Sequence, residues 1–326
     1  MTTRILAVAC ASLAIAGSAI AQQADSSFRF AISEPAFSIG TGPVVCIDEA
    51  HANMHTATGT YLPFATLLRD DGYRVQSLTA WSRAALQPCA VVAIANAVAP
   101  ANVRDRSLPH PPAFSKPEFD TLIAWIGEGG GLLLIADHTP FPGAVGALGL
   151  VLGVGMLDAF AAPGDSGGVI AIFGTQNLSD STWRRYATDR LIQFRSVAGA
   201  LTNPGTLGSH AILRGRNDRE GVRWVTTFTG HAFYASTRVA PLLIFGPRAV
   251  AGIDRADAAW FPIGGWLQAG AIEFGSGRAV VLGEATTCTA QVGGPRRIRT
   301  GMNVPEAPDN VRFCLNVVHW LTKVLN

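Results

Sequence analysis

Short apolar runs alternate with segments of helical spacing through the first half of the chain. Residues 44–48, 89–95 and 132–136 are apolar runs of the length and composition of strands that are buried on both faces of a sheet. Between them, residues 61–68 and 116–126 carry apolar side chains at helical spacing. This alternation predicts βαβ units with right-handed crossovers, and therefore an α/β fold built on a parallel sheet.

Local signals place several further elements. Ser115 and Glu118 have the spacing of a capping box, which predicts a helix that begins there. A glycine turn at 275–277 predicts a hairpin between strands at 271–274 and 278–283. We also expect strands at 210–213, 224–229 and 240–245, mixed helical spacing over 183–197, and a final amphipathic helix over 310–325.

The composition indicates a well-buried chain with little net charge. Of its 326 residues, 48% are hydrophobic and 15% are charged, whereas charged residues make up about 25% of a typical soluble domain. The formal net charge of +2 is too small to indicate a nucleic-acid or anionic-membrane partner. The chain has no internal repeat and no disordered linker, so we expect one domain over residues 43–326, with an elaborated insertion around residues 158–270.

Residues 1–21 have the features of a cleavable signal peptide. Arg4 supplies the positive n-region, an apolar stretch follows it, and an A-x-A cleavage site ends at Ala21, directly before Gln22. The stretch is too short and too rich in alanine to span a membrane, and no other segment is a clear transmembrane helix. We therefore expect a periplasmic or secreted protein whose mature chain begins with an exposed N-terminal arm over residues 22–42.

Four cysteines remain in that mature chain, namely Cys46, Cys89, Cys288 and Cys314. No CxxC pair occurs, which argues against a zinc ribbon. Export permits disulfides, and four cysteines allow three pairings, all of which stay open at this point. Buried free thiols are the other interpretation, because cysteine is among the most buried residue types.

Ionisable side chains follow three of the expected strands at the point where each strand ends. They are, in chain order, Asp48, Glu49, His51, Asp137, His138 and Glu284. Parallel strands bring their carboxyl ends to one edge of the sheet, where open α/β folds bind their ligands, so we expect these groups to converge. Carboxylates and imidazoles together can transfer protons or hold a metal. For each residue alone, the alternative is a structural role such as capping a helix or turn.

The spacing of His51 and His55 raises the question of a metal. Histidines four residues apart on a helix share a face, so these two, with Asp137 and His138, form a candidate site for a divalent ion. Against this, the glutamate of an H-E-x-x-H motif is absent and Pro63 favours a loop. The chain also contains no Walker-type phosphate loop and no G-x-S-x-G elbow.

Longer motifs extend over most of the mature chain. They lie at residues 48–56 with Gly59 and Tyr61, and at 67–73, 136–141, 227–230, 277–285, 289–291, 301–303, Asn310 and 316–321. In these motifs the chain resembles a family of exported bacterial proteins that have a class I glutamine-amidotransferase-like domain. The resemblance implies a flavodoxin-like, three-layer α/β fold with a mostly parallel, doubly wound sheet and additional β structure in the second half.

The resemblance does not carry over an activity. Class I amidotransferases place a nucleophilic cysteine after a central strand, but here that strand runs into Asp137 and His138, and no cysteine is near. We therefore do not expect a thiol-dependent glutaminase. Cys288 follows the last strand, where that family places a histidine and an acid, and the resemblance puts Glu284 at the position of the acid.

We expect an exported enzyme of the hydrolase type. A carboxylate of the strand-end group, or His51, would act as a general base on water, with or without a divalent metal. The alternative is a non-catalytic binding module, in which the same residues form hydrogen bonds to a small polar ligand such as a carbohydrate or cell-wall fragment. A structural role in a larger complex is the third interpretation.

Overall fold

The computed structural model describes residues 22–164, 191–196, 205–252, 260–293 and 297–326, and the expected signal peptide lies outside them. Its strands are β1 (Gln23–Ala24), β2 (Val44–Asp48), β3 (Arg74–Leu78), β4 (Val91–Ala95), β5 (Gly131–Ile135), β6 (Val154–Met156), β7 (Phe160–Ala162), β8 (Ile192–Arg195), β9 (Gly205–Leu207), β10 (Trp224–Thr227), β11 (Phe233–Ala235), β12 (Ala240–Ile244), β13 (Val250–Gly252), β14 (Phe261–Pro262), β15 (Leu267–Phe274), β16 (Gly277–Leu282), β17 (Ala290–Gly293) and β18 (Ile298–Gly301). Its helices are α1 (Leu62–Asp70), α2 (Arg83–Leu86), α3 (Lys116–Gly127), α4 (Phe141–Leu152), α6 (Ala211–Arg214) and α7 (Asn310–Leu321), with 3-10 turns η1 (Pro100–Asn102), η4 (Asp218–Glu220) and η5 (Thr286–Cys288).

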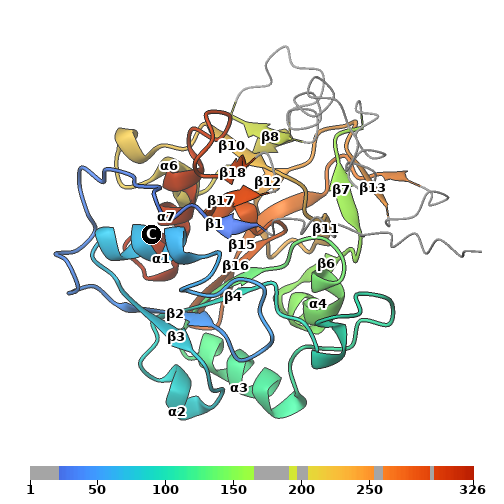
Figure 1. Ribbon diagram of the computed structural model, residues 1–326, viewed down its shortest axis with the longest axis horizontal. Helices are drawn as coiled ribbons and strands as arrows, with labels where there is room; N and C mark the ends of the chain where they lie inside the picture. Colours follow the sequence, from blue (N-terminus) through green and yellow to red (C-terminus); the bar gives the residue numbers. More distant parts are fainter. Residues whose placement is uncertain (1–21, 165–190, 197–204, 253–259, 294–296) are drawn as a thin grey trace, which may run out of the picture.

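One large mixed sheet runs through the molecule, with strands in the order β10-β8-β9-β12-β15-β16-β5-β4-β2-β3 (Figure 1). The pairs from β16 to β3 are all parallel, which confirms the parallel sheet expected from the first half of the chain. Beyond β16 the neighbouring pairs are antiparallel except for β8 with β9. The change from parallel to antiparallel pairing follows from the tight turn between β15 and β16, because a connection this short joins only antiparallel strands. Two small antiparallel sheets, β1-β17-β18 and β14-β13-β7, complete the β structure.

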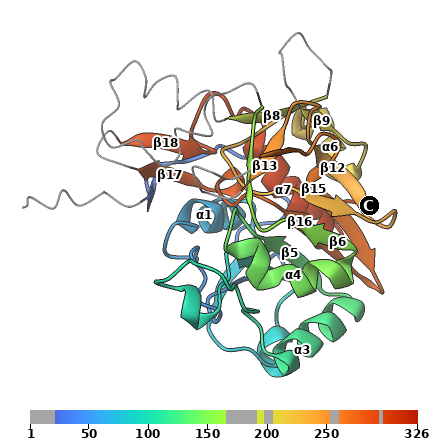
Figure 2. The ribbon, with the colours of Figure 1, turned by 90° about the vertical axis from the view of Figure 1, so that its right-hand side faces the viewer.

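Helices cover both faces of the parallel strands, so the core has three layers (Figures 1 and 2). Successive residues of a strand point to opposite faces. Val45 and Ile47 of β2 therefore join the cluster that includes Phe64 of α1 and Phe313 of α7. Val44 and Cys46 join the opposite cluster, which includes Leu122 of α3 and Val145 of α4.

Most of the local predictions match the structure. The α3 capping box is present, and the Ser115 N–H donates to Glu118 Oε2 at 2.8 Å. The hairpin is also present, with Glu273 opposite Arg278. The strand expected at 210–213 is wrong: these residues form α6, because the His210 side chain accepts a hydrogen bond from Ile212 N and caps a helical turn.

The mixed helical spacing expected over residues 183–197 is wrong for the part of this range that the structure describes, residues 191–196. Residues 183–190 and 197 lie outside the described residues. Residues 192–195 form the strand β8, whose pairing with β10 and β9 outweighs the local pattern.

The four cysteines form two disulfides, which decides between the pairings left open and excludes free thiols at these positions. Cys46 is bonded to Cys89, which ties β2 to the residues just before β4. Cys288 is bonded to Cys314, which ties η5 to α7. The first bond therefore braces two neighbouring strands of the parallel sheet, and the second braces the 3-10 turn that follows β16.

Replacing Cys288 and Cys314 together with alanine is expected to lower the free energy of unfolding by roughly 3 kcal/mol, because the bond closes a loop with a sequence separation of 26 residues. Urea unfolding followed by circular dichroism measures this. The Cys46→Ala, Cys89→Ala protein is the matched comparison and should lose slightly more, because its loop spans 43 residues. Unchanged stability in the first variant would contradict a native bond.

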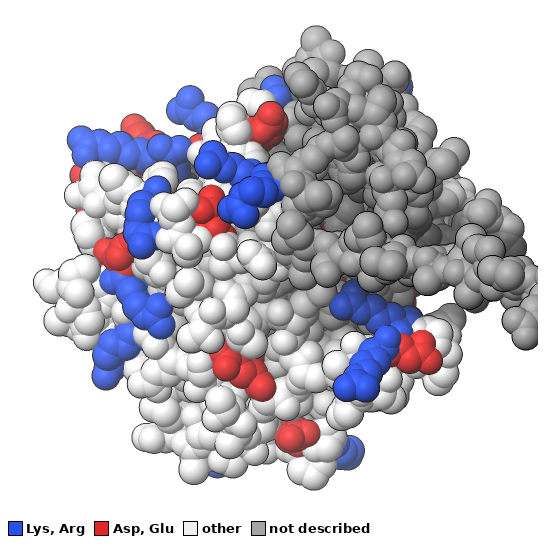
Figure 3. Space-filling model, in the orientation of Figure 1, with Lys and Arg blue, Asp and Glu red and all other residues white. Residues whose placement is uncertain are grey.

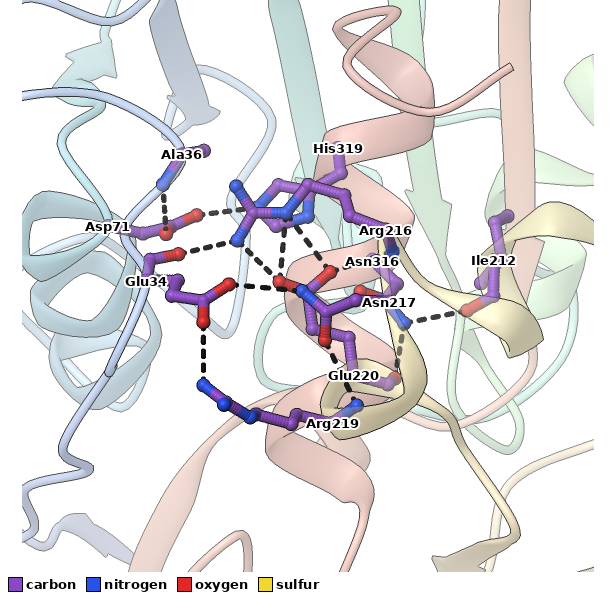
Figure 4. A network of polar contacts seen from close by, with 10 residues as sticks. All are labelled: Glu34, Ala36, Asp71, Ile212, Arg216, Asn217, Arg219, Glu220, Asn316 and His319. Carbon is purple, nitrogen blue, oxygen red and sulfur yellow. Dashed lines mark hydrogen bonds and ion pairs between the residues drawn. The ribbon is translucent and has the colours of Figure 1, made fainter.

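Most residues of the N-terminal arm are exposed, as the sequence predicts, but the arm is also anchored to the rest of the fold at several points. β1 pairs with β17, and the Phe37 ring packs edge-on against Tyr73 at 5.1 Å between centroids. Further along, the Ala36 N–H donates to Asp71 Oδ1 at 2.8 Å, and Arg216 Nη2 donates to the Glu34 carbonyl (Figure 4). The arm therefore forms part of the fold.

Charged side chains are dispersed over the surface. On the face in Figure 3, basic side chains at the upper left lie beside acidic ones, which fits the net charge of +2. Within the described ranges, no helix is both long and apolar enough to cross a membrane.

Candidate functional site

The carboxyl ends of four neighbouring parallel strands place polar residues along one edge of the sheet. Asp48 ends β2, Asn96 follows β4, Asp137 lies just beyond β5 and Glu284 just beyond β16. All four side chains are buried. The convergence expected from the sequence is therefore present at the level of the backbone, but the side chains divide into two groups.

Asp137 and Glu284 form the first group. Asp137 Oδ1 accepts a hydrogen bond from His138 N at 2.8 Å, and Thr229 also bonds this carboxylate. Glu284 is fully buried and accepts hydrogen bonds from Thr286 N at 2.8 Å and from Thr287 N and Oγ1 at 2.7 and 2.5 Å. These bonds hold both carboxylates in fixed orientations.

The two carboxylates also perturb each other's ionisation. Burial raises the pKa of Asp137 to about 6. Burial and, second, the negative charge of Asp137 raise the pKa of Glu284 to about 7. Two like charges in a buried site do not readily ionise together, so near neutral pH the pair behaves as one unit that holds and releases a proton.

Asp137 reaches a small pocket of about 80 Å³ that Glu284 does not line. Asn96 and Thr229 lie in its wall, and the Asn96 side chain accepts a hydrogen bond from Asp137 N at 2.8 Å. Asn96 adopts the left-handed conformation, with φ of 55°, in which asparagine is one of the few tolerated side chains. This turn aims its amide at the backbone of Asp137.

Two histidines complete the pocket wall. His55 shares a 2.6 Å hydrogen bond with Thr60 and stacks on Tyr61, and burial lowers its pKa to about 4, so it is neutral at pH 7. His138 stacks on Phe160, with ring centroids 4.1 Å apart, and its Nδ1 donates to the Thr139 carbonyl.

Asp48 and His51 form the second group, and neither lines the Asp137 pocket. His51 Nδ1 lies 2.9 Å from Asp48 Oδ2, and Asn53 donates to the same oxygen at 3.0 Å. The imidazole packs against both Trp81 and Phe114, with the Phe114 ring centroid 3.8 Å from its own. This group therefore braces the loop after β2 against the segment that leads into α3.

Glu49 also has a structural environment. Its Oε1 accepts hydrogen bonds from Ala57 N at 2.9 Å and from Ser77 Oγ at 2.8 Å, so it organises the loop and ties it to β3. Of the six residues expected in the site, Asp137 and His138 line the pocket, Glu284 lies behind it, and Asp48, Glu49 and His51 support the loop beside it.

The geometry gives no support to the proposed metal ligands His51, His55, Asp137 and His138. The described part of the chain contains no group of three or more His, Cys, Asp and Glu side chains that could hold a metal ion. His51 and His55 lie on a loop, so a spacing of four residues does not bring them to the same face as it would on a helix. Their Nδ1 atoms form hydrogen bonds with Asp48 and Thr60, respectively.

Several neutral polar residues of the site were missed because the sequence argument considered ionisable groups alone. They include Asn96, Thr229, Thr286 and Thr287, as well as Tyr61, whose hydroxyl donates to the Ala285 carbonyl at 2.7 Å. Asn96 directly follows the strand expected at 89–95, and Thr229 is the last residue of the strand expected at 224–229, so extending the strand-end rule to neutral polar residues would have found both.

A larger cleft of about 520 Å³ lies apart from this pocket, between the N-terminal arm, the α6–η4 segment and α7. Many of its charged groups pair with one another (Figure 4). Arg216 pairs with Glu220, Arg219 with Glu34, and His319 with Asp71. These ion pairs join the N-terminal arm, the α6–η4 segment and α7 to one another. Because the paired side chains are already occupied with each other, the smaller pocket is the better candidate for an active site.

The Glu284→Gln protein is expected to gain stability relative to the native protein as the pH rises from about 4 to 7. The folded-state pKa of Glu284, about 7, lies above the unfolded value of about 4.3. Between these two pKa values the folded protein binds more protons than the unfolded protein. The contribution of Glu284 to the stability of the native protein is therefore present at low pH and is lost as the pH rises through 7. Urea unfolding of both proteins at pH 4.5 and 7.5 tests this, and a stability difference that is independent of pH would contradict it.

No protein-family model matches the chain, and no curated protein matches it. Among solved structures, the mmIFT52 N-terminal domain matches with a TM-score of 0.52 and 14% identity, covering 86% of this chain and 97% of that one. The cytoplasmic protein STM3548 from Salmonella typhimurium matches at 0.47 and 12%, covering 86% and 98%. A ThuA-like protein from Bacteroides uniformis matches at 0.42 and 11%, covering 90% and 94%. At these identities the likeness concerns the fold alone, and the first match supports a mixed α/β fold over most of the chain.

Proposed function

We propose that this protein is a hydrolase-like enzyme in which Asp137 transfers the proton. The observation that supports this most strongly is a buried carboxylate at a small polar pocket, with a second carboxylate behind it. Perturbed titration of a residue in a cleft is a recognised mark of functional sites. A pKa near the working pH also suits a group that must both accept and return a proton.

The chemistry follows from the charge of the pair. With one proton on Glu284, ionised Asp137 accepts a proton from a water molecule in the pocket as that water attacks the substrate. Asp137 then returns the proton to the leaving group. Asn96 and Thr229 hold the Asp137 segment and carboxylate in place, so the base does not have to reorient during the reaction.

A thiolate mechanism has no candidate among the described cysteines, because Cys46, Cys89, Cys288 and Cys314 all form disulfides. This supports the proposal that the chain is not a thiol-dependent glutaminase. It also supports a variant of the class I glutamine-amidotransferase-like, three-layer fold in which acid–base chemistry replaces the thiol. Export, with the substrate met outside the cytoplasm, is part of the same proposal and is compatible with the two disulfides.

The experiment is an assay of the purified mature protein against p-nitrophenyl glycosides, p-nitrophenyl acetate and γ-glutamyl-p-nitroanilide between pH 4 and 9. We expect turnover of at least one class, with a rate that changes through pH 6–7 as the carboxylate pair titrates. A protein that hydrolyses none of the three classes, or whose rate ignores this pH range, would contradict the proposal.

A non-catalytic binding module is the second candidate, and the size of the pocket favours it. At about 80 Å³ the pocket fits only one small polar group, such as a hydroxyl or amide of a carbohydrate or cell-wall fragment. Calorimetric titration with soluble peptidoglycan fragments discriminates the two. Binding without any product supports the module, whereas product formation supports the enzyme.

A further inference from the structure

The first described residue, Gln22, lies in the wall of the Asp137 pocket. Its position is held by the small sheet directly after it. Gln23 pairs with Val292 and Ala24 with Gln291, and Asp25 N donates to the Ala290 carbonyl at 2.8 Å. The Gln22 side chain lies over Gly293, where an added Cβ would come within 3.1 Å of Gln22 Cγ. The chain is therefore anchored within one residue of the pocket.

Gln22 is also the residue that the signal-peptide pattern places first in the mature chain, because the A-x-A site ends at Ala21. The two observations are independent: one comes from the leader pattern, the other from strand pairing on the far side of the cleavage site. Together they place the new amino terminus at the pocket.

The pocket otherwise lacks a permanent positive charge. Its described lining residues include Asp137 but no lysine or arginine, and the two histidines in the wall are His55, which is neutral at pH 7, and His138. A cation at this point would share the pocket with the Asp137 carboxylate.

We propose that cleavage after Ala21 creates part of the site: the α-amino group of Gln22 becomes the cationic group of the Asp137 pocket. An α-amino group ordinarily titrates near 7.7–8 and Asp137 at about 6, so both groups are charged in the range between these two values. It adds a charge-assisted donor to the pocket that Asp137 also lines, which suits a bound molecule with a carbonyl or carboxylate oxygen beside the bond to be hydrolysed. The precursor, whose residue 22 is in a peptide bond, lacks this group. The inference rests on the proposed role of Asp137 and on the expected cleavage.

The first step of the test is the identity of the amino terminus. The full chain is expressed in an exporting bacterial host, and the mature protein is examined by intact mass and by sequencing of its N-terminal peptide. We expect a chain that begins at Gln22 with a free amine. A different first residue, an uncleaved chain, or a mass short of one ammonia, which marks cyclisation of Gln22 to a neutral ring, would overturn the proposal.

The second step measures the contact. Reductive methylation with ¹³C-formaldehyde labels the α-amine, and the chain's two lysines, Lys116 and Lys323, are the only other amines, so the NMR signal is readily assigned. We expect the α-amine to titrate at lower pH in Asp137→Asn than in the native protein, by several tenths of a pH unit, because the anion of the pocket is gone. The matched control is Asp120→Asn, a carboxylate on the exposed side of α3.

Equal titration of the α-amine in the native and Asp137→Asn proteins would overturn the proposal. The titration of the α-amine does not depend on turnover, so this result can be distinguished from a failure of the proposed function, which is tested by substrate hydrolysis. If the Asp137→Asn protein did not fold, the same comparison is made with Asp137→Ser, which also removes the anion: titration of the α-amine at lower pH than in the native protein supports the contact, and equal titration overturns it.

Discussion

Replacing Asp137 with asparagine is expected to lower turnover by about 10²- to 10⁴-fold, the range typical for loss of a general acid–base group. The substitution keeps the shape of the side chain and removes its ability to accept a proton. The measurement is kcat and kcat/KM on whichever substrate class the native protein hydrolyses, at pH 6 and 8. Because the change affects the chemical step, we expect the loss mainly in kcat.

The control for this change is Asp120→Asn, which alters an exposed carboxylate that pairs with Lys116 on α3. It should retain native turnover. An Asp137→Asn protein that is folded and fully active would show that Asp137 only shapes the loop after β5.

Replacing His319 with leucine is expected to lower the free energy of unfolding by about 3–5 kcal/mol, because it leaves the buried Asp71 carboxyl group without its hydrogen-bond partner. His319 Nε2 lies 2.6 Å from Asp71 Oδ2, and the side chains are 1% and 0% exposed. Asp71 also accepts the Ala36 N–H, so the pair joins α7, the end of α1 and the N-terminal arm (Figure 4). Urea unfolding measures the loss.

Two comparisons make this prediction specific. Arg219→Ala removes an exposed ion pair to Glu34 in the same network and should cost less than about 1 kcal/mol. Adding Asp71→Leu to His319→Leu removes both polar groups and should recover part of the loss. If His319→Leu cost no more than Arg219→Ala, the buried pair would not be an important contact of the fold.

The elements that could be predicted from the sequence are those whose signal is local. Residues 44–48 and 132–136 are continuous apolar runs, and such runs fit strands buried on both faces. The α3 start follows from the Ser115 and Glu118 spacing, and the β15–β16 hairpin from its glycine turn. The polar ends of β5 and β16 could also be placed at one edge, because parallel strands put them there.

What could not be predicted depends on contacts between distant segments. Whether a strand-end carboxylate enters a pocket or braces a loop depends on its neighbours: Asp48 meets His51 and Asn53, whereas Asp137 meets Thr229 and faces open space. β8 is a strand because β10 and β9 pair with it. The apolar residues of the N-terminal arm follow no regular period, and its position depends on pairing with β17 and on the hydrogen bond to Asp71.

The most direct test of the acid–base pair is the titration of the Asp137 carboxyl group, followed by ¹³C NMR in the mature protein and assigned by its loss in Asp137→Asn. We predict a midpoint at about pH 6, because burial raises the pKa of this group, and a lower Glu284 midpoint in Asp137→Asn than in the native protein. A midpoint near the usual aspartate value of about 3.9, with Glu284 unaffected by the substitution, would contradict the pair as the centre of the site.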